Sequence, residues 1–160
     1  MLASKLPVFS IQKEEVVQIF NQQLENCGVE YFDYFLLHNM NIHHYNSVVK
    51  SCKMFEHMQE WKKAGKIKHI AISFHDSADV LDLILSEHPE IEAVQIALNY
   101  YDWNSAFIQA KACFEVIRKH QKQVIIMEPV KGGMLANPPK NSNLTADASL
   151  ALRFCGELDG

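Results

Sequence analysis

The sequence lacks the features that mark several large classes of protein. No apolar run approaches the roughly 20 residues that a membrane-spanning helix needs. The first five residues have neither the charged segment nor the long apolar stretch of a signal peptide. No Gly-x-Gly-x-x-Gly motif follows an apolar run, so the phosphate fingerprint of a dinucleotide-binding Rossmann domain is missing. We therefore expect no membrane partner, and any nucleotide must bind in another way.

Cysteine is scarce and dispersed. The four cysteines are Cys27, Cys52, Cys113 and Cys155, and none forms a Cys-x-x-Cys pair. This spacing fits reduced thiols and predicts a cytoplasmic protein rather than a disulfide framework. The histidines His38, His43 and His44 lie close together, but no acid or cysteine stands at ligand spacing beside them. We expect no metal site.

Charge is spread rather than concentrated. The formal net charge is −4, and the 15 lysines and arginines are scattered, apart from the lysines of 62–68. We interpret those lysines as the end of a helix and its following loop, where cations complement the helix dipole. A surface that binds nucleic acid needs a basic patch, so nucleic acid is not an expected partner.

What is present is a regular alternation of strand and helix signals, typical of βα units around a parallel sheet. The 160 residues, 48% of them hydrophobic, predict one globular domain over residues 1–160. The predicted strands are Leu2–Val8, Tyr31–His38, Ile67–Phe74, Ala93–Leu98 and Val124–Met127. The predicted helices run over 10–27, over 47–64, from a cap at Asp76, from Asn104 or Ser105, and from a cap at Thr145 to Cys155.

Two α/β architectures fit this alternation. A closed βα barrel needs eight strands and eight helices and typically about 250 residues, whereas we find five of each. A doubly wound five-stranded sheet suits the length better. The pattern alone leaves both open.

The segment Asp33–His38 is an apolar run that ends in a titratable side chain. Such a run indicates a strand buried on both faces. In a βα barrel the carboxyl ends of the strands face the active site, so His38 would be catalytic or binding. A core histidine bonded to a neighbouring strand fits this single run equally well.

Polar residues also end the other strands. They are Lys5, Ser73 with His75, Gln95 with Asn99, and Glu128. Each alone has an ordinary structural explanation, but burying the whole set at one sheet edge is costly unless the side chains bind a ligand or one another. We therefore expect them to line one edge of the sheet.

Several segments together resemble the middle of an aldo-keto reductase, in order and spacing. They are Ser4–Pro7, Tyr34–His38, Gly65–Ser73, Val94–Tyr100 and Met127–Gly133. The Ser73-Phe74-His75 and Met127-Glu128-Pro129 variants look most like a bacterial and archaeal branch whose longer members add an iron–sulfur segment. The resemblance implies an incomplete TIM barrel covering about strands three to seven.

By the same resemblance, the chain is an oxidoreductase that reduces aldehydes or ketones with NADP or NAD. Lys5 and His38 match two members of the catalytic tetrad. Ser73 and Gln95 match positions that hydrogen-bond the nicotinamide carboxamide, and Met127 stands where many relatives stack a tyrosine on the ring. The family often has asparagine where this chain has Phe74. Its catalytic tyrosine and aspartate lie upstream of the lysine, and no tyrosine here matches.

Further expectations follow from these matches. Asn39, His75 and Asn99 follow strands and are expected to line the substrate pocket, which would hold a small carbonyl compound. Unpaired sheet edges predict self-association, and the missing tyrosine predicts negligible activity of residues 1–160 alone. Two other functions stay open. The chain could be a catalytically dead remnant that binds a nucleotide or a partner, or another α/β enzyme that uses His38 as a base.

Overall fold

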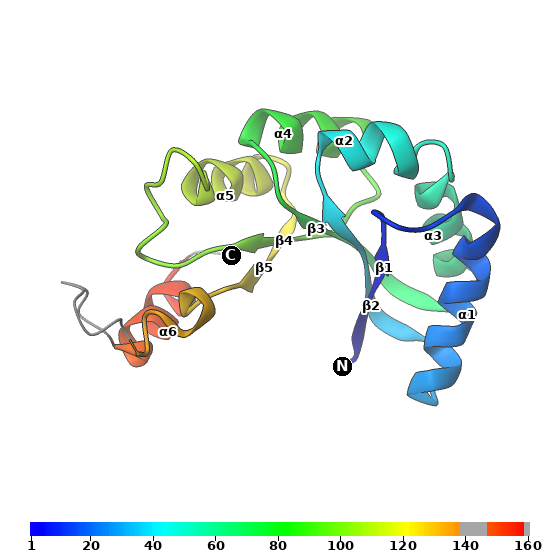
Figure 1. The fold of residues 1–160 in the computed structure, drawn as a ribbon, viewed down its shortest axis with the longest axis horizontal. Helices are drawn as coiled ribbons and strands as arrows, with labels where there is room; N and C mark the ends of the chain where they lie inside the picture. The colour runs from blue at the N-terminus through cyan, green and yellow to red at the C-terminus, as the bar shows by residue number, and fades with distance from the viewer. Residues whose placement is uncertain (138–146, 159–160) are drawn as a thin grey trace.

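The computed structural model describes residues 1–137 and 147–158, and its centre is one parallel sheet (Figure 1). The strands are β1 (Ala3–Pro7), β2 (Phe32–Met40), β3 (Ile67–Phe74), β4 (Ala93–Ala97) and β5 (Gln123–Met127). They pair in chain order, each parallel to the next. The predicted α/β class with five parallel strands and alternating helices is confirmed, and β3 has the predicted bounds.

Helices connect successive strands and lie in an arc around one side of the sheet (Figure 1). The longer ones are α1 (Val16–Cys27), α3 (Met54–Lys63), α4 (Ala78–Glu87), α5 (Ala110–Lys119) and α6 (Ala148–Gly156). The short ones are η1 (Lys13–Glu15), α2 (Ile42–His44), the π-helical turn η2 (Tyr45–Val49) and η3 (Lys131–Gly133). Strand, helix and parallel strand recur as in a βα barrel.

The two faces of the sheet carry separate apolar clusters. The larger cluster lies under the helices, where the Phe20 ring of α1 stacks on Trp61 of α3 with centroids 3.8 Å apart. The smaller one, on the opposite face, contains Leu36, Ala71 and Ala93. Burial on both faces explains why the strands read as continuous apolar runs.

Two expected helix starts are wrong. The helix expected from Ser10 begins as η1 at Lys13, because Gln12 and Glu15 form a capping box in which the Gln12 backbone N–H donates to the Glu15 carboxylate over 2.8 Å. Asp76 is not the cap of α4, whose N-cap is Ser77. The Asp76 carboxylate instead accepts the backbone N–H of Ile42, 2.9 Å away on another connection.

The helix expected over 47–64 is interrupted. The π-helical turn η2 comes first, Lys53 then has a φ of +52°, and α3 begins only at Met54. The Tyr45 side chain that starts η2 is fully buried, and its hydroxyl donates to Glu87 at the end of α4. This contact with a distant helix fixes the turn, and no local pattern reports it.

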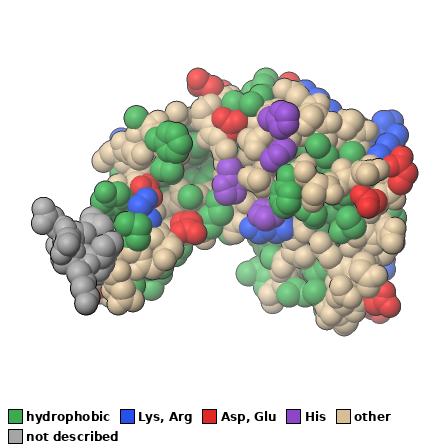
Figure 2. All heavy atoms as spheres, in the orientation of Figure 1, with side chains coloured by type: hydrophobic (Ala, Val, Ile, Leu, Met, Phe, Trp, Pro, Cys, Tyr) green, Lys and Arg blue, Asp and Glu red, His purple; other side chains and the backbone are tan. Residues whose placement is uncertain are grey.

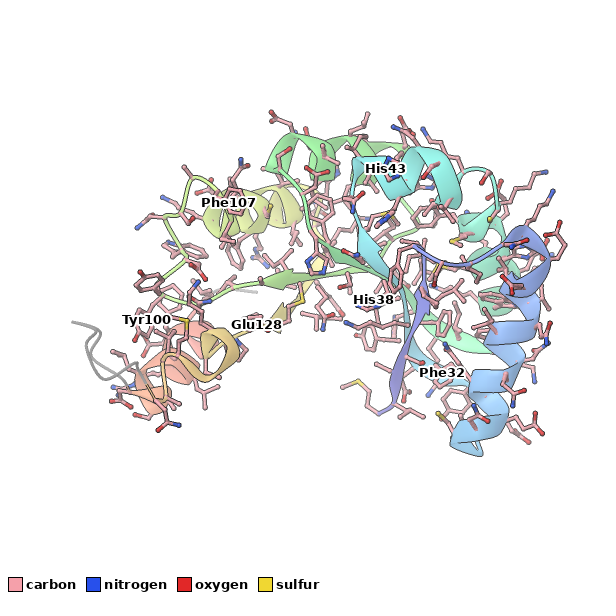
Figure 3. All side chains as sticks on the ribbon, viewed as in Figure 1. Phe32, His38, His43, Tyr100, Phe107 and Glu128 are labelled. Atoms are coloured by element: carbon pink, nitrogen blue, oxygen red, sulfur yellow. The ribbon has the colours of Figure 1, made fainter. Side chains whose placement is uncertain are left out.

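The helix expected from Asn104 or Ser105 is also shorter than predicted. α5 begins at Ala110, and Gln109 before it has a φ of +54°. The Gln109 side chain accepts the backbone N–H of Ala78 at the start of α4, over 3.1 Å. Phe107, expected on the buried face of this helix, is 92% exposed on the preceding loop (Figure 3).

Three residues singled out in the sequence lie in parts of the chain that the structure does not describe. Thr145, the expected cap of the last helix, and the prolines Pro138 and Pro139 lie outside the described residues. Within the described part, α6 has Asp147 as its N-cap, which accepts the backbone N–H of Ser149 over 2.8 Å. All four cysteines are free. In the described ranges, no helix is long and apolar enough to cross a membrane.

Candidate active site on the inner face of the sheet

The register of the sheet brings the polar strand ends onto one face. Lys5 pairs with Leu36, and His38 lies two residues further along β2, so both side chains project to the same side. Leu36 also pairs with Ala71, which places Ser73 on this face, and Ser73 pairs with Gln95. We call this helix-free side of the sheet the inner face.

Curvature of the sheet closes the distance between nonadjacent strands. The Lys5 ammonium on β1 donates a hydrogen bond to the Gln95 side-chain oxygen on β4, although β2 and β3 lie between these strands. At the other end of the inner face, the Tyr34 hydroxyl of β2 donates to the Gln123 oxygen of β5 over 2.6 Å. Such contacts require a strongly curved sheet, as in a segment of a barrel wall.

Three basic side chains share the carboxyl end of this face. Burial lowers the pKa of Lys5. The pKa of His38 is lowered by burial and then by the positive charge of Lys5. The pKa of His75 is lowered by burial, by His38 and by Lys5. No carboxylate forms an ion pair with any of the three within residues 1–137 and 147–158. The site is therefore electropositive, and its histidines are held neutral at pH 7.

Histidine side chains gather near the middle of the visible face in Figure 2, with lysine beside the lowest of them. His38 lies near the end of β2, across the open side of the sheet from Glu128, which follows β5 (Figure 3). The structure thus brings Lys5, His38, His75, Ser73 and Gln95 together, as the strand-end argument expected. Glu128 is exposed, with a φ of +59°.

Ser73 and Gln95 form an adjacent pair of polar groups. The Ser73 side chain has no exposed surface, and its hydroxyl lies 3.3 Å from Nε2 of His75. The Gln95 oxygen is occupied by Lys5, while its NH₂ group makes no hydrogen bond within the described part of the chain. A hydroxyl beside an unpaired amide donor suits a carboxamide ligand, which both donates and accepts hydrogen bonds.

Met127 ends β5 on the same face, because it pairs with Ala97, two residues beyond Gln95. Its side chain is half-buried. Thioethers make favourable contacts with aromatic rings, so Met127 is suited to contact a flat ring held by Ser73 and Gln95. The position of Met127 on the inner face agrees with the family resemblance, and its contact with a nicotinamide ring stays a prediction.

The three residues expected to line the substrate pocket differ in their access to it. His75 approaches Ser73 on the inner face, and it also lines a cavity of about 440 Å³ together with Phe74, Ile96 and Cys113. These three residues belong to the apolar cluster under the helices, so this cavity lies on the helix-covered side of the sheet. Asn39 is half-buried beside His38 and has a φ of +63°. Asn99 has no exposed surface. Its assignment to the pocket stays a prediction, and its contacts favour a structural role.

Asn99 lies beside an ion pair between Asp102 and Lys131 that the sequence analysis missed, and together these residues join two loops. The Asn99 NH₂ group donates to the Asp102 carboxylate over 3.1 Å and to the Glu128 carbonyl over 3.2 Å. The Lys131 ammonium in turn donates to both Asp102 carboxylate oxygens, over 2.7 and 2.6 Å. No periodic signal connects residues 29 positions apart, so only the fold reveals this pair.

An aromatic neighbour of His38, Phe9, was also missed. The Phe9 ring, after β1, packs edge-on against His38 with centroids 5.9 Å apart, and lies 6.4 Å from the His44 ring. Phe9 is 51% exposed, so it forms a rim beside the site rather than core. No group of three metal-ligating side chains is found among the described residues.

Comparisons with known proteins place this arrangement in one family. A model described as the aldo/keto reductase family matches residues 1–151. A search of curated proteins found no match. Solved structures match in fold. One is an aldo/keto reductase from Brucella melitensis, with 22% identity and a TM-score of 0.65 over 86% of this chain and 49% of that one.

Two further neighbours were solved with small molecules. An aldo/keto reductase from Klebsiella pneumoniae in complex with NADP and acetate has 14% identity and a TM-score of 0.65, over 87% of this chain and 45% of that one. A thermostable aldo-keto reductase with the inhibitor epalrestat has 18% identity and a TM-score of 0.65, over 84% and 46%. The chain thus spans just under half the length of these proteins. The family model matches residues 1–151, which contain all five strands of the curved parallel sheet. The chain therefore belongs to the aldo-keto reductase family.

Proposed function

We propose that the inner face is the cofactor and substrate site of an NADP- or NAD-dependent oxidoreductase that reduces aldehyde or ketone carbonyls. The observation that carries this proposal is the convergence of Lys5, His38, Ser73 and Gln95 on the inner face. Two aldo-keto reductases from Klebsiella pneumoniae that are similar in fold were solved in complex with NADP or NADPH. When bound, the nicotinamide would supply the hydride.

The chain's own residues would bind the nicotinamide and polarise the substrate carbonyl. Ser73 and the free NH₂ group of Gln95 would hold the carboxamide, and Met127 would contact the ring. His38 would donate a ring N–H to the carbonyl oxygen, where negative charge develops during reduction. Its lowered pKa favours the neutral imidazole, so it acts as a hydrogen-bond donor rather than a proton source. The Lys5 ammonium adds positive potential at the same place.

Cofactor binding can be tested with matched glutamine variants. Gln95→Leu removes the amide proposed to hold the carboxamide, whereas Gln123→Leu changes the opposite end of the same face. Losing one or two hydrogen bonds of about 1 kcal/mol each corresponds to a dissociation constant about 5- to 30-fold larger. NADPH and NADH are titrated against tryptophan fluorescence, with Trp61 and Trp103 as reporters. Equal affinities of the two variants, or no binding by the unsubstituted chain, would contradict the proposal.

We further propose that residues 1–160 alone have negligible carbonyl reductase activity. The family resemblance calls for a tyrosine acid beside the lysine and histidine. Here the Tyr34 hydroxyl binds Gln123 at the far end of the inner face, and the Tyr45 hydroxyl binds Glu87. NADPH-dependent turnover of a reactive aldehyde by the purified chain, abolished by His38→Ala, would refute this.

A catalytically dead remnant that binds a nucleotide is the second candidate, supported by the Tyr34 and Tyr45 hydroxyls being engaged with Gln123 and Glu87. Cofactor binding without turnover fits both this candidate and an incomplete enzyme. No binding at all leaves a role in protein interaction. The chain is proposed to act in the cytoplasm, a reducing environment that suits its four free thiols.

Self-association is proposed from the sheet edges. Among the described strands, β1 and β5 each pair on one side only. Unpaired backbone groups at a sheet edge favour association with another chain. Sedimentation velocity at tens of micromolar should detect dimers or larger species, and a clean monomer would count against the proposal.

A further inference from the structure

The end of β2 contains a local irregularity at His38. β2 and β3 pair regularly up to Leu37 and Ile72, and pairing then resumes at Met40 and Phe74. Two residues of β2, His38 and Asn39, therefore face the single residue Ser73 of β3. This arrangement is a β-bulge, which re-aims the side chains of the bulged strand. The bulge thus sets the direction in which His38 leaves the strand.

The bulge is strained at Asn39. Its φ of +63° lies in the left-handed region, which is unfavourable for non-glycine residues, although asparagine adopts it more readily than most. Such a conformation persists only where surrounding contacts hold it. The question is which contacts hold Asn39.

His44 supplies the shortest polar contact to Asn39. Its Nδ1 lies 2.8 Å from the Asn39 carbonyl oxygen. A carbonyl oxygen only accepts hydrogen bonds, so we assign the proton to Nδ1 of His44, which donates to Asn39 over the shorter distance. With this tautomer, the Asn41 NH₂ nitrogen, 3.0 Å from the same Nδ1, makes no hydrogen bond to it. The amide nitrogen of Asn41 is 3.5 Å from the Asn39 carbonyl oxygen, at the limit of a hydrogen bond.

His44 is itself held in place. The Asn41 side-chain oxygen caps α2 by accepting the His44 backbone N–H over 2.9 Å. The backbone N–H of Ile42, at the start of α2, donates to the Asp76 carboxylate. The Phe9 ring contacts both the His44 ring and the His38 ring, so an apolar contact joins the two histidines. The contacts that hold His44 thus do not involve His38. His44 is linked to His38 through the Asn39 carbonyl and through the Phe9 ring.

We propose that His44 is a positioning residue, which holds the strained bulge at Asn39 through its Nδ1–H and so fixes the direction of the His38 ring. The importance of His38 rests on the proposed function, but the geometric statement does not. His44 acts through Asn39 and Phe9 and needs no contact with substrate or cofactor.

The test uses two neighbouring histidines. His44→Asn removes the ring that reaches Asn39. His43→Asn is the matched control, because the His43 side chain is exposed and its only described contact is the His44 ring (Figure 3). Imidazole ¹H–¹⁵N spectra of the 1–160 chain should show the His38 ring resonances shifted or broadened in His44→Asn and unchanged in His43→Asn. His44→Gln, whose amide N–H can reach the same carbonyl, should restore part of the original His38 signal. Identical His38 signals in His44→Asn and His43→Asn would overturn the proposal.

A second measurement remains decisive if His44→Asn folds poorly. Asn39→Gly relieves the left-handed strain, because glycine adopts this φ freely. If His44 acts by holding Asn39, the glycine should raise the melting temperature less in a His44→Ala background, where Asn39 can relax, than in the unsubstituted chain, where Asn39 is held at positive φ. A coupling of about 2–4 °C corresponds to the strain of one residue in a chain of this size. Additive shifts would refute the proposal. NADPH titration separates the positioning role of His44 from the proposed function. If the chain binds no NADPH but the His38 ring still moves in His44→Asn, only the proposed function is refuted.

Discussion

The ion pair between Lys131 and Asp102 gives the sharpest test of how burial controls stability in this chain. The Lys131 ammonium contacts both oxygens of a carboxylate whose side chain is only 11% exposed. Replacing Lys131 with Met leaves that carboxylate in the protein without its cation. Breaking a buried pair costs about 3–5 kcal/mol. Because the Lys131 side chain is 27% exposed, solvent screening reduces the expected cost to about 2–3 kcal/mol.

Lys119 provides a matched control. Its ammonium also contacts both oxygens of an aspartate, Asp82, over 3.0 and 2.9 Å, but these side chains are 65% and 37% exposed. Lys119→Met is therefore expected to cost about 0–1 kcal/mol. The two substitutions remove the same atoms from the same geometry. They differ in burial, and Asp82 also keeps its contact with the His120 ring, which further lowers the cost expected for Lys119→Met.

The assay is urea unfolding followed by circular dichroism. With a slope of about 2 kcal/mol per M, Lys131→Met should lower the unfolding midpoint by about 1 M, and Lys119→Met by less than about 0.5 M. Equal midpoints for the two variants would refute the reasoning. An accompanying change of slope in Lys131→Met would instead indicate local opening of the two loops.

Three further predictions concern single groups. The lowered pKa values of His38 and His75 mean that the folded chain binds fewer protons than the unfolded chain near pH 6, so the free energy of unfolding should fall as pH drops below about 6.5. The double variant His38→Asn, His75→Asn should flatten urea midpoints measured between about pH 7.5 and 5.5, and a parallel curve would contradict this. Burial raises the pKa of the Cys113 thiol to about 11. A thiol-specific disulfide reagent at neutral pH should therefore label the exposed Cys27 before Cys113, and equal labelling rates of the two cysteines would contradict this. Phe107→Ser should change the free energy of unfolding by no more than about 0.5 kcal/mol, because the ring is 92% exposed; a loss typical of a core phenylalanine would show that this ring is covered in solution.

The inner face also explains why the site tolerates three basic groups without a carboxylate. Lys5, His38 and His75 are partly removed from water, and their mutual repulsion is relieved when the histidines stay neutral. The loss of stability expected in acid is therefore the thermodynamic counterpart of a site that keeps His38 as a neutral donor.

The sequence by itself determined the strands and the family. β3 was predicted at Ile67–Phe74 because burial on both faces leaves an unbroken apolar run that any local reading detects. The strand-end positions of Lys5, His38, Ser73 and Gln95 were also readable, because parallel strands end at a common edge and their side chains alternate with period two.

Only the tertiary structure decided what interrupts the helices and what surrounds His38. Gln109, just before α5, accepts the backbone N–H of Ala78 at the start of α4, and the Tyr45 hydroxyl donates to Glu87, 42 residues away. The hydrogen bond between Lys5 and Gln95 requires the curvature of four strands. These contacts join distant segments through hydrogen bonds and charge. Such interactions depend on distances of a few ångströms, which no local periodicity encodes.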